Sequence, residues 1–287
     1  MRKWAAVIGA PIDHSLSPVL HRRAYELVGL DWEYRRYRVE AEQVTDFVAD
    51  LDGNCAGLSV TMPCKQTLLA AADVVDGLAK AVGAANTLVQ SGGLRAAFNT
   101  DVHGIVESLL RARNEELQES AARNRREKAR AVILGTRATA SSALAAVTTL
   151  GFEDVTVIGR NFSGPDTVTQ AANRLKVQFR PVPWRLIDAT VEAVDQADLV
   201  ISTVPSHVSV SLLEGWQIRP SQQILDVTYA DGLGPLADAF SAAGAHVSSP
   251  LVMLVAQGLA QVKLMSGLEA PFEPVLEAVE AAAERKS

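Results

Sequence analysis

Hydrophobic residues in the first hundred positions occur in short runs that alternate with stretches of helical spacing. The runs contain valine, isoleucine, threonine or tyrosine, which favour β-strands. They lie at residues 5–8, 34–39, 57–60 and 87–89. The stretch at residues 19–28 follows Ser17 and Pro18, a pair typical of a helix start, with the serine as N-cap and the proline in the first turn. Strands that alternate with helices indicate an α/β domain.

A second alternating block begins near residue 131. Its expected strands lie at residues 131–134, 155–158, 199–202 and 224–227, and a helix of small residues is expected at 140–150. This order is typical of a doubly wound, Rossmann-like domain. After Ser249 and Pro250 the pattern predicts only two helices, at 251–265 and 272–284, which we expect to fold back onto the first domain.

The two blocks are separated by a strongly charged stretch, residues 107–128, which has helix-forming residues and neither proline nor glycine. We interpret it as an exposed helical connector. A chain of 287 residues is long enough for two domains, because domains usually span about 100 to 200 residues. The predicted fold class is α/β, with a substrate domain at residues 1–105 plus 250–287 and a nucleotide domain at 106–249.

Composition narrows the classes of partner. The chain is 48% hydrophobic and 21% charged, values typical of a soluble globular protein, and its net charge is −6. A negative chain is a poor partner for nucleic acid or an anionic membrane surface, and no apolar stretch reaches the roughly 20 residues that span a bilayer. Cys55 and Cys64 lack the spacing of a disulfide framework or a zinc site. We expect a cytoplasmic protein that binds a small molecule.

A candidate nucleotide site follows the strand at 131–134. A strand that ends in Gly135 and continues into a helix of small residues presents backbone N–H groups and the positive helix end to a pyrophosphate. The predicted contacts are Gly135, Thr136, Arg137, Ala138 and Thr139. The usual G-x-G-x-x-G/A fingerprint has glycine where this chain has Arg137. Arg137 either adds a charged contact to the phosphate or crowds it, and the sequence leaves both interpretations open.

The end of the second strand of this block bears on the choice of cofactor. NAD sites usually have an acidic residue there for the ribose 2′-hydroxyl, whereas NADP sites have an arginine near the 2′-phosphate. The chain has Arg160 and Asn161 at this position and no acidic residue. The guanidinium is a planar set of donors suited to phosphate, so we predict NADP. The alternative is that Arg160 is only a solvated loop residue.

Polar residues of the first block suggest a substrate site. Ser15 and Ser17 place two hydroxyls beside a helix start, where they could bind a carboxylate or only cap the helix. Lys65 and Asp101 offer an amine and a carboxylate on turns, a pairing suited to proton transfer during oxidation of an alcohol. Asp101 also has an interpretation as N-cap of a helix that begins near Val102. Which of Lys65 and Asp101 is the base stays open.

Five segments, in this order along the chain, resemble the motifs of shikimate dehydrogenases. They are Gly9 to Pro18 (GAPIDHSLSP), Ser59 to Lys65 (SVTMPCK), Gly83 to Thr87 (GAANT), Asn99 to Asp101 (NTD) and Met253 to Gly258 (MLVAQG). The resemblance covers nearly the whole chain. It implies a two-domain enzyme of the shikimate pathway of aromatic amino acid biosynthesis, which reversibly reduces 3-dehydroshikimate to shikimate with NADPH. The substrate would lie between the two domains.

The resemblance also implies roles for individual residues. Ser15 and Ser17 would bind the substrate carboxylate, and Lys65 and Asp101 would form the catalytic pair. The ring hydroxyls would be bound by Thr61, Asn86, Asp101 and Gln257. Tyr229 would reach the substrate from the nucleotide domain. The chain departs from the family pattern at Ser59, where asparagine is usual, and at Arg137, where glycine is usual; we expect only the second to threaten activity.

Three alternatives and two further expectations accompany this hypothesis. The chain could instead be an NAD-dependent quinate or quinate/shikimate dehydrogenase. It could be a paralogue that binds a cyclic hydroxy acid without hydride transfer, an idea motivated by Arg137. A folate-linked dehydrogenase of related layout has no use for the Ser15 to Ser17 element. No metal is expected, because the five histidines lack ligand spacing, and the oligomeric state is expected to be a monomer or a homodimer.

Overall fold

The computed structural model describes residues 2–112, 129–205, 208, 215–228 and 234–285. The chain divides into two compact units, residues 1–104 with 254–287 (unit 1) and residues 105–253 (unit 2). The divisions fall within α5 (Asp101–Arg111) and α12 (Pro250–Ser266). The connector expected at 107–128 is helical as far as Arg111, and residues 113–128 lie outside the described part. No helix among the described residues is long and apolar enough to cross a membrane.

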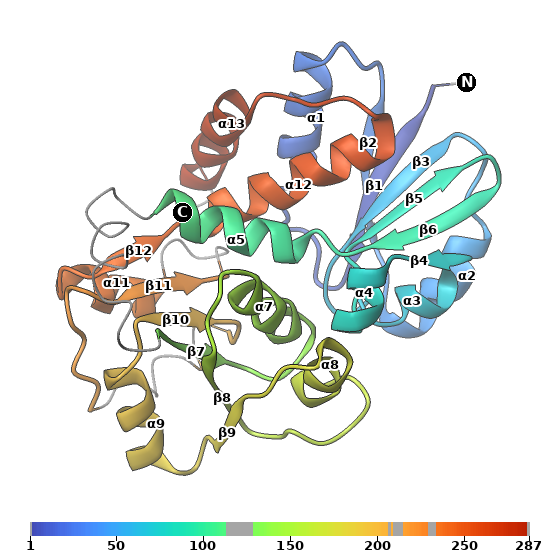
Figure 1. Cartoon of the computed structure of the whole chain (residues 1–287). Helices are drawn as coiled ribbons and strands as arrows, with labels where there is room; N and C mark the ends of the chain where they lie inside the picture. Colours follow the sequence, from blue (N-terminus) through green and yellow to red (C-terminus); the bar gives the residue numbers. More distant parts are fainter. Residues whose placement is uncertain (1, 113–128, 206–207, 209–214, 229–233, 286–287) are drawn as a thin grey trace. The chain divides into compact units, whose positions relative to one another are not determined.

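Unit 1 is built on a six-stranded sheet with the order β2-β1-β3-β5-β6-β4 (Figure 1). Its strands are β1 (Trp4–Gly9), β2 (Glu33–Arg38), β3 (Cys55–Val60), β4 (Val74–Val75), β5 (Thr87–Ser91) and β6 (Leu94–Phe98). Its helices are α1 (Ser17–Leu27), α2 (Val44–Ala49), α3 (Leu68–Ala71), α4 (Gly77–Val82) and α13 (Phe272–Glu284), with a 3-10 turn η1 (Ala41–Gln43) and most of α12. β1 pairs in parallel with β2 and β3, whereas β5 is antiparallel to β3 and to β6.

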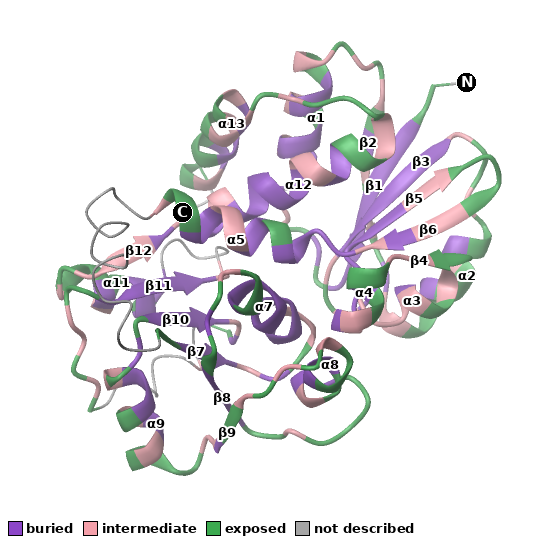
Figure 2. Ribbon diagram, viewed as in Figure 1, coloured by how far each residue is buried: buried purple, intermediate pink, exposed green. Residues whose placement is uncertain are grey.

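Both faces of this sheet are covered, which is why β1 and β3 are buried along their whole lengths (Figure 2). Trp4, Ala6 and Ile8 of β1 belong to a core cluster that also contains residues of α2, α3 and α4. On the other face α12 approaches β3 closely, because a Cβ on Gly57 would meet the Met265 side chain. Glycine at this position therefore lets the helix lie against the strand.

Unit 2 is a six-stranded parallel sheet with the order β12-β11-β10-β7-β8-β9. Its strands are β7 (Arg130–Leu134), β8 (Asp154–Gly159), β9 (Arg180–Pro183), β10 (Leu199–Ser202), β11 (Gln223–Asp226) and β12 (His246–Ser248), and its helices are α7 (Ala138–Thr149), α8 (Val168–Leu175), α9 (Ile187–Asp195) and α11 (Pro235–Ala242). α9 and α11 share one core cluster with the sheet, and α7 contacts α8. Numbered along the chain within this unit, the strand order is 3-2-1-4-5-6, the Rossmann order, which confirms the predicted fold class.

Two expectations about helix starts are wrong. Ser17 is the first residue of α1 and Leu16 is its N-cap, with no side-chain cap hydrogen bond. Asp101 is already the first residue of α5, and the amide of Val102 donates to Oδ1 of Asn99 at 3.3 Å instead. In both cases the true cap lies further upstream than predicted. The Asp101 carboxylate is thereby available for other partners.

Candidate active site

The ends of four strands meet at one edge of the unit 1 sheet. Thr61 follows β3 and its amide donates to the Ile8 carbonyl at the end of β1, 3.0 Å away. Because β5 is antiparallel to β3, Asn86 at the start of β5 lies beside the end of β3, and its carbonyl accepts from the Val60 amide at 2.7 Å. The Asn86 amide donates to Phe98, the last residue of β6. Polar residues far apart in sequence are thus gathered at this edge.

Lys65 and Asp101 form a direct ion pair at this edge. Lys65 Nζ donates to Asp101 Oδ2 at 2.6 Å, and the two side chains are 14% and 6% exposed. The turn that holds Lys65 is fixed by the Cys64 amide, which donates to the Thr61 carbonyl, and by the Lys65 carbonyl, which accepts from the Ala85 amide at 2.8 Å. The predicted amine and carboxylate are therefore within hydrogen-bonding distance and largely shielded from water.

Asn86 connects this pair to two further polar side chains. Its two Nδ2 hydrogens are shared among three acceptors, Asp101 Oδ1 at 2.8 Å, Thr100 Oγ1 at 2.9 Å and Gln257 Oε1 at 3.1 Å. Its Oδ1 accepts from the Thr100 amide at 2.8 Å. A backbone amide can only donate, so this contact fixes which end of the Asn86 side chain faces Asp101. The structure thus brings four predicted residues, Lys65, Asn86, Asp101 and Gln257, into one hydrogen-bonded cluster.

The other predicted substrate contacts lie after β1 and β3. Ser15 precedes α1, and its Oγ accepts from the Ser17 amide at 3.3 Å, which leaves the hydroxyl hydrogen of Ser15 able to donate elsewhere. Ser17 is buried at the first position of α1. Gly9 lies so close to Thr61 that a Cβ on the glycine would collide with the threonine methyl group. The two loops therefore run side by side at the end of adjacent strands.

Two buried side chains of unit 1 have shifted pKa values. Cys64 is buried next to Lys65, its Sγ lies 3.1 Å from the Val39 carbonyl, and burial raises the pKa of this thiol to about 11. His21 in α1 is fully buried and burial lowers its pKa to about 4, opposed by a hydrogen bond between Nδ1 and the Ser17 carbonyl at 3.0 Å. Cys64 is therefore a protonated thiol and His21 a neutral ring at physiological pH.

The nucleotide turn of unit 2 requires glycine where the sequence has it. Gly135 follows β7 with φ of +116°, and a Cβ there would collide with Oγ1 of Thr203, which follows β10. A Cβ on Gly159, at the end of β8, would collide with the methyl group of Thr136. The turn is thus pressed against the ends of β8 and β10, and α7 begins immediately after it at Ala138. Such a cradle fits a dinucleotide pyrophosphate.

Arg137 causes no backbone strain in this turn. It is the N-cap of α7, with φ of −100° and ψ of −163°, and its side chain is exposed. Any L-residue can adopt this extended conformation, so glycine is not needed here. Thr139 lies in the first turn of α7, half-buried. The departure from the fingerprint therefore does not by itself prevent the turn from forming.

Arg160 and Asn161 lie directly after β8, and both are exposed. Within the described residues, the Arg160 guanidinium has no hydrogen-bond or ion-pair partner in the protein, whereas Asn161 Oδ1 accepts from the Ser163 amide at 2.8 Å. A free guanidinium at this position fits a 2′-phosphate. Tyr229, the remaining predicted substrate contact, lies outside the described residues.

Sequence reasoning assigned no role in the site to three residues that are hydrogen-bonded to the cluster. Thr87 Oγ1 donates to Asn86 Oδ1 at 2.9 Å, and Gln261 Nε2 donates to Thr87 Oγ1 at 3.1 Å. Ser59 Oγ donates to Gln261 Oε1 at 2.6 Å. The one signal available was the spacing of Gln261, four residues after Gln257 and so on the same side of a largely apolar helix.

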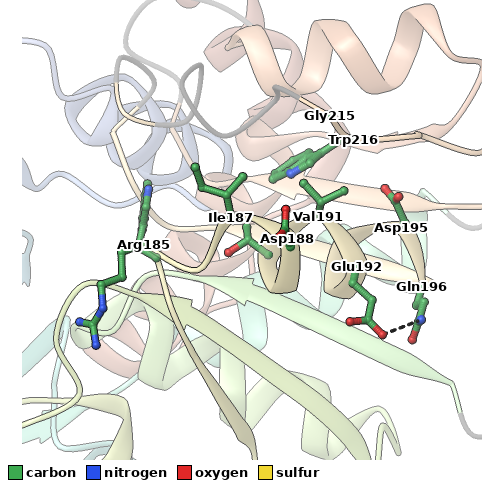
Figure 3. A pocket seen from close by; sticks show the side chains of 11 residues that line it. Arg185, Ile187, Asp188, Val191, Glu192, Asp195, Gln196, Gly215 and Trp216 are labelled. Carbon is green, nitrogen blue, oxygen red and sulfur yellow. Dashed lines mark hydrogen bonds between the residues drawn. The ribbon is translucent and has the colours of Figure 1, made fainter.

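A separate cavity of about 1100 Å³ lies in unit 2 beside α9 (Figure 3). Val191 and Trp216 face it, together with the carboxylates of Asp188, Glu192 and Asp195. None of the predicted site residues lines it. An acidic lining disfavours a substrate carboxylate or a nucleotide phosphate, so the cavity is not a candidate for either. Among the described residues no cluster of possible metal ligands occurs.

The two units together define a class of protein. Unit 2 has the Rossmann strand order with a glycine turn suited to a dinucleotide, and unit 1 presents a shielded ammonium–carboxylate pair next to amide and hydroxyl groups. The first arrangement is typical of cofactor-dependent oxidoreductases, and the second is suited to moving a proton to or from an alcohol. Together these features define a two-domain dehydrogenase that acts on a small polar substrate.

Comparison with known proteins identifies the family. Residues 7–88 match the shikimate dehydrogenase substrate binding domain, and residues 251–280 match the shikimate 5′-dehydrogenase C-terminal domain. A shikimate dehydrogenase (NADP(+)) of Oleidesulfovibrio alaskensis is 33% identical over 284 residues, covering 94% of this chain and 92% of the relative. One of Moorella thermoacetica is also 33% identical, covering 93% and 88%. The chain belongs to the shikimate dehydrogenase family.

Solved structures agree with this assignment. The crystal structure of Mycobacterium tuberculosis shikimate dehydrogenase has a TM-score of 0.81 and 34% identity, covering 98% of this chain and 99% of that one. The Thermus thermophilus enzyme, in complex with NADP(H) and shikimate, has a TM-score of 0.77 over 98% and 99% of the two chains. At 24% identity the second comparison supports the fold alone. The two-domain α/β fold predicted from the sequence is confirmed.

Proposed function

We propose that the protein is an NADP-dependent shikimate dehydrogenase, which interconverts shikimate and 3-dehydroshikimate in aromatic amino acid biosynthesis. The observation that supports this function most directly is the ion pair of Lys65 and Asp101, held at 2.6 Å and shielded from water. Relatives that match nearly the whole chain are named for this NADP-dependent activity. Oxidation of the alcohol removes a hydride from carbon and a proton from oxygen, so the enzyme needs a cofactor and a proton acceptor.

The Lys65 and Asp101 pair takes the hydroxyl proton during oxidation and returns it during reduction. The two groups share a hydrogen bond, so we assign the proton to the pair and not to either residue. NADP, when bound, supplies the hydride acceptor. Low exposure of both side chains strengthens their electrostatic effect on the reacting oxygen, because little water competes for them.

Neighbouring residues orient the substrate. We assign the ring hydroxyls to Thr61, Asn86, Asp101 and Gln257, whose side chains combine donors with acceptors. The substrate carboxylate is assigned to the hydroxyls of Ser15 and Ser17, at the start of α1, where the positive end of the helix dipole favours an anion. Tyr229 is proposed as a further substrate contact.

The cofactor is assigned to unit 2. The backbone of the turn that includes Gly135, Thr136, Arg137, Ala138 and Thr139 would hold the pyrophosphate, since α7 begins there and its first N–H groups face outwards from the helix end. Arg160 and Asn161 would bind the 2′-phosphate, because the exposed Arg160 guanidinium has no partner among the described residues and is available for it. The exposed Arg137 side chain would add a second positive charge near the phosphates.

The domain boundaries proposed from the sequence, 1–105 plus 250–287 and 106–249, divide the protein into these two roles. We place the protein in the cytoplasm, where thiols stay reduced, and this agrees with Cys55 and Cys64, which are both free. We propose that it acts as a monomer or a homodimer.

A steady-state assay tests the function directly. Initial rates should be measured with shikimate and with quinate, each with NADP and with NAD. We expect the highest kcat/KM with shikimate and NADP. Higher kcat/KM with quinate and NAD would overturn the proposal in favour of a quinate dehydrogenase. Absence of turnover with all four pairs, together with no NADPH binding at millimolar concentration, would identify a paralogue that does not transfer hydride.

A further inference from the structure

A chain of buried hydrogen bonds runs through unit 1 and ends at the Asp101 carboxylate. Tyr34 Oη donates to Ser59 Oγ at 2.6 Å, and Ser59 Oγ donates to Gln261 Oε1 at 2.6 Å. Tyr34, Ser59 and Gln261 are 1%, 3% and 1% exposed. Buried polar groups of this kind are expensive unless they are satisfied, so their arrangement is specified by their partners.

The direction of the hydrogen bonds at Gln261 is fixed by a backbone carbonyl. Gln261 Nε2 lies 3.0 Å from the Asn86 carbonyl oxygen, which can only accept a hydrogen bond. The amide nitrogen of Gln261 must therefore face Asn86, and its oxygen must face Ser59. Ser59 is then obliged to donate to Gln261, and it is free to accept from Tyr34.

The same Gln261 amide also sets the hydroxyl of Thr87. Nε2 donates to Thr87 Oγ1 at 3.1 Å, and Thr87 Oγ1 in turn donates to Asn86 Oδ1 at 2.9 Å. Asn86 then donates from Nδ2 to Asp101 Oδ1. Gln261 thus holds Asn86 twice, by its main-chain carbonyl and, through Thr87, by its side-chain oxygen. Every hydrogen bond in the chain donates toward Asp101.

We infer that Gln261 is a positioning residue for the reaction and that Ser59 and Tyr34 set its orientation. This inference rests on the proposed function, because it concerns the geometry of Asn86 and Asp101 toward the substrate. Gln261 does not touch the Lys65 and Asp101 pair, so it acts through Asn86. Ser59, which stands where the family usually has asparagine, provides the hydroxyl that donates to Gln261 Oε1.

Stacking on the His21 ring holds Tyr34, the first donor in this series of hydrogen bonds. The two rings are 4.1 Å apart between centroids with an interplanar angle of 16°. His21 is fully buried in α1 and is held by its Nδ1 at the Ser17 carbonyl. The phenol of Tyr34 is therefore supported from the same helix that begins beside the proposed carboxylate-binding serines.

The test is Gln261→Met, which keeps the side-chain length and removes every hydrogen bond. We expect kcat/KM for shikimate to fall about tenfold, equivalent to about 1.4 kcal/mol of transition-state stabilisation. The KM for shikimate should rise while the KM for NADP stays unchanged. A merely structural role would lower the amount of folded enzyme and leave both KM values as they are.

Gln222→Met is the matched control in unit 2. Gln222 is fully buried, its Nε2 donates to the carbonyls of Val194 and Ala197, and its Oε1 accepts from the Arg219 amide. Its loss should lower the Tm about as much as Gln261→Met does while leaving the KM for shikimate unchanged. Equal kinetic constants for Gln261→Met and the wild type, within twofold, would overturn the inference.

A second pair of variants covers the case in which Gln261→Met does not fold. Ser59→Ala removes the donor to Gln261 Oε1, and we expect about a threefold fall in kcat/KM for shikimate, whereas Ser59→Thr keeps the hydroxyl and should restore most of it. Equal kcat/KM for shikimate in Ser59→Ala and the wild type would refute the role of these hydrogen bonds in positioning Gln261 and Asn86. Failure of the wild type itself to oxidise shikimate would refute the proposed function instead, so the two outcomes are distinguishable.

Discussion

Removal of the positive charge at Lys65 should cost both activity and stability, and the two losses should separate in a double variant. In Lys65→Met the Asp101 carboxylate, 6% exposed, loses its 2.6 Å partner and keeps only the Asn86 side chain among the side-chain donors in the described structure. Breaking a buried ion pair by removing one partner typically costs about 3 to 5 kcal/mol. The lysine is 14% exposed and Asp101 begins α5, where the helix dipole favours an anion.

These two features place the expected cost below that range, at about 2 kcal/mol. For a chain of this size, 1 kcal/mol corresponds to a Tm shift of about 2 to 4 °C, so Lys65→Met should lower the Tm by about 4 to 8 °C. Asp101→Asn alone should cost less, because Lys65 can turn its ammonium toward water. In the double variant no charge remains unpaired, so most of the loss in Lys65→Met should be recovered.

The measurement is a double-mutant cycle on the free energy of unfolding, with turnover of shikimate recorded for each variant. We expect a coupling energy of about 1 to 2 kcal/mol and turnover reduced at least a thousandfold in all three variants. Lys80→Met is the matched control, since Lys80 is exposed in α4 and distant in sequence from the pair. It should change neither quantity appreciably.

Two results would refute this reasoning. A coupling energy below about 0.5 kcal/mol would show that Lys65 and Asp101 do not interact as a buried ion pair. Turnover of Lys65→Met within tenfold of the wild type would remove Lys65 from proton transfer altogether. The second result would leave the hydrogen-bonded cluster intact as a binding site while removing its chemical role.

Three further predictions concern groups outside this pair. Burial lowers the pKa of His21 from 6.5 to about 4, so the folded state favours the neutral ring. The free energy of unfolding should therefore be highest above pH 6.5 and fall by about 3 kcal/mol as the pH drops toward 4. Urea unfolding of the wild type and of His21→Phe at both pH values checks this, and an equal change in the free energy of unfolding of the two proteins would contradict it. Burial raises the pKa values of Cys64 and Cys55 to about 11 and about 12, so a thiol reagent at pH 8 should label neither in the native protein and both in urea. Arg160→Ala should raise the KM for NADP about tenfold or more and leave the KM for NAD little changed, and a parallel change in both would remove Arg160 from the 2′-phosphate site.

In unit 2, hydrophobic patterning predicts the central strands well and the edges poorly. β7 and β10 are buried along most or all of their lengths, so their apolar runs are continuous and the sequence identifies them. β9 and β12 were not predicted, and they are the two edge strands of unit 2. β9 includes two prolines and is largely accessible, and β12 has only three residues. Short, partly exposed strands have too little periodicity to be recognised.

The errors at helix starts have a different origin. Ser17 and Asp101 are residue types that favour the N-cap, and each lies within one residue of a helix start. The propensity was therefore sound, but the tertiary setting placed the first turn earlier. At α5 the cap-like hydrogen bond goes to Asn99, while the Asp101 carboxylate faces Lys65 and Asn86. For the Asp101 carboxylate, the charged hydrogen bond to Lys65 is stronger than a bond to a helix amide. The side-chain amide of Asn99 accepts from the helix amide in its place.

The candidate site was partly accessible to sequence reasoning. Lys65, Asn86 and Asp101 lie in short segments that the family resemblance singles out, and the structure brings them together. The hydrogen bond of Gln257 to Asn86 joins residues 171 positions apart, and that of Ser59 to Gln261 joins residues 202 apart. Such contacts depend on how α12 lies against β3, which is set by Gly57 and Met265, and no local pattern encodes it.

Among the described residues, the partners of the Asp101 carboxylate belong to unit 1. Lys65 follows β3 and Asn86 precedes β5, and both contact the carboxylate directly. Gln261 lies in α12 and acts on Asn86 through Thr87. The folding of unit 1 therefore orients the carboxylate. A carboxylate oriented in advance needs no reorganisation when charge develops on the substrate oxygen, which is where preorganised groups contribute most to catalysis. Substitutions at the nucleotide turn of unit 2 should therefore change cofactor affinity, whereas those that loosen Gln261 should lower kcat/KM for shikimate.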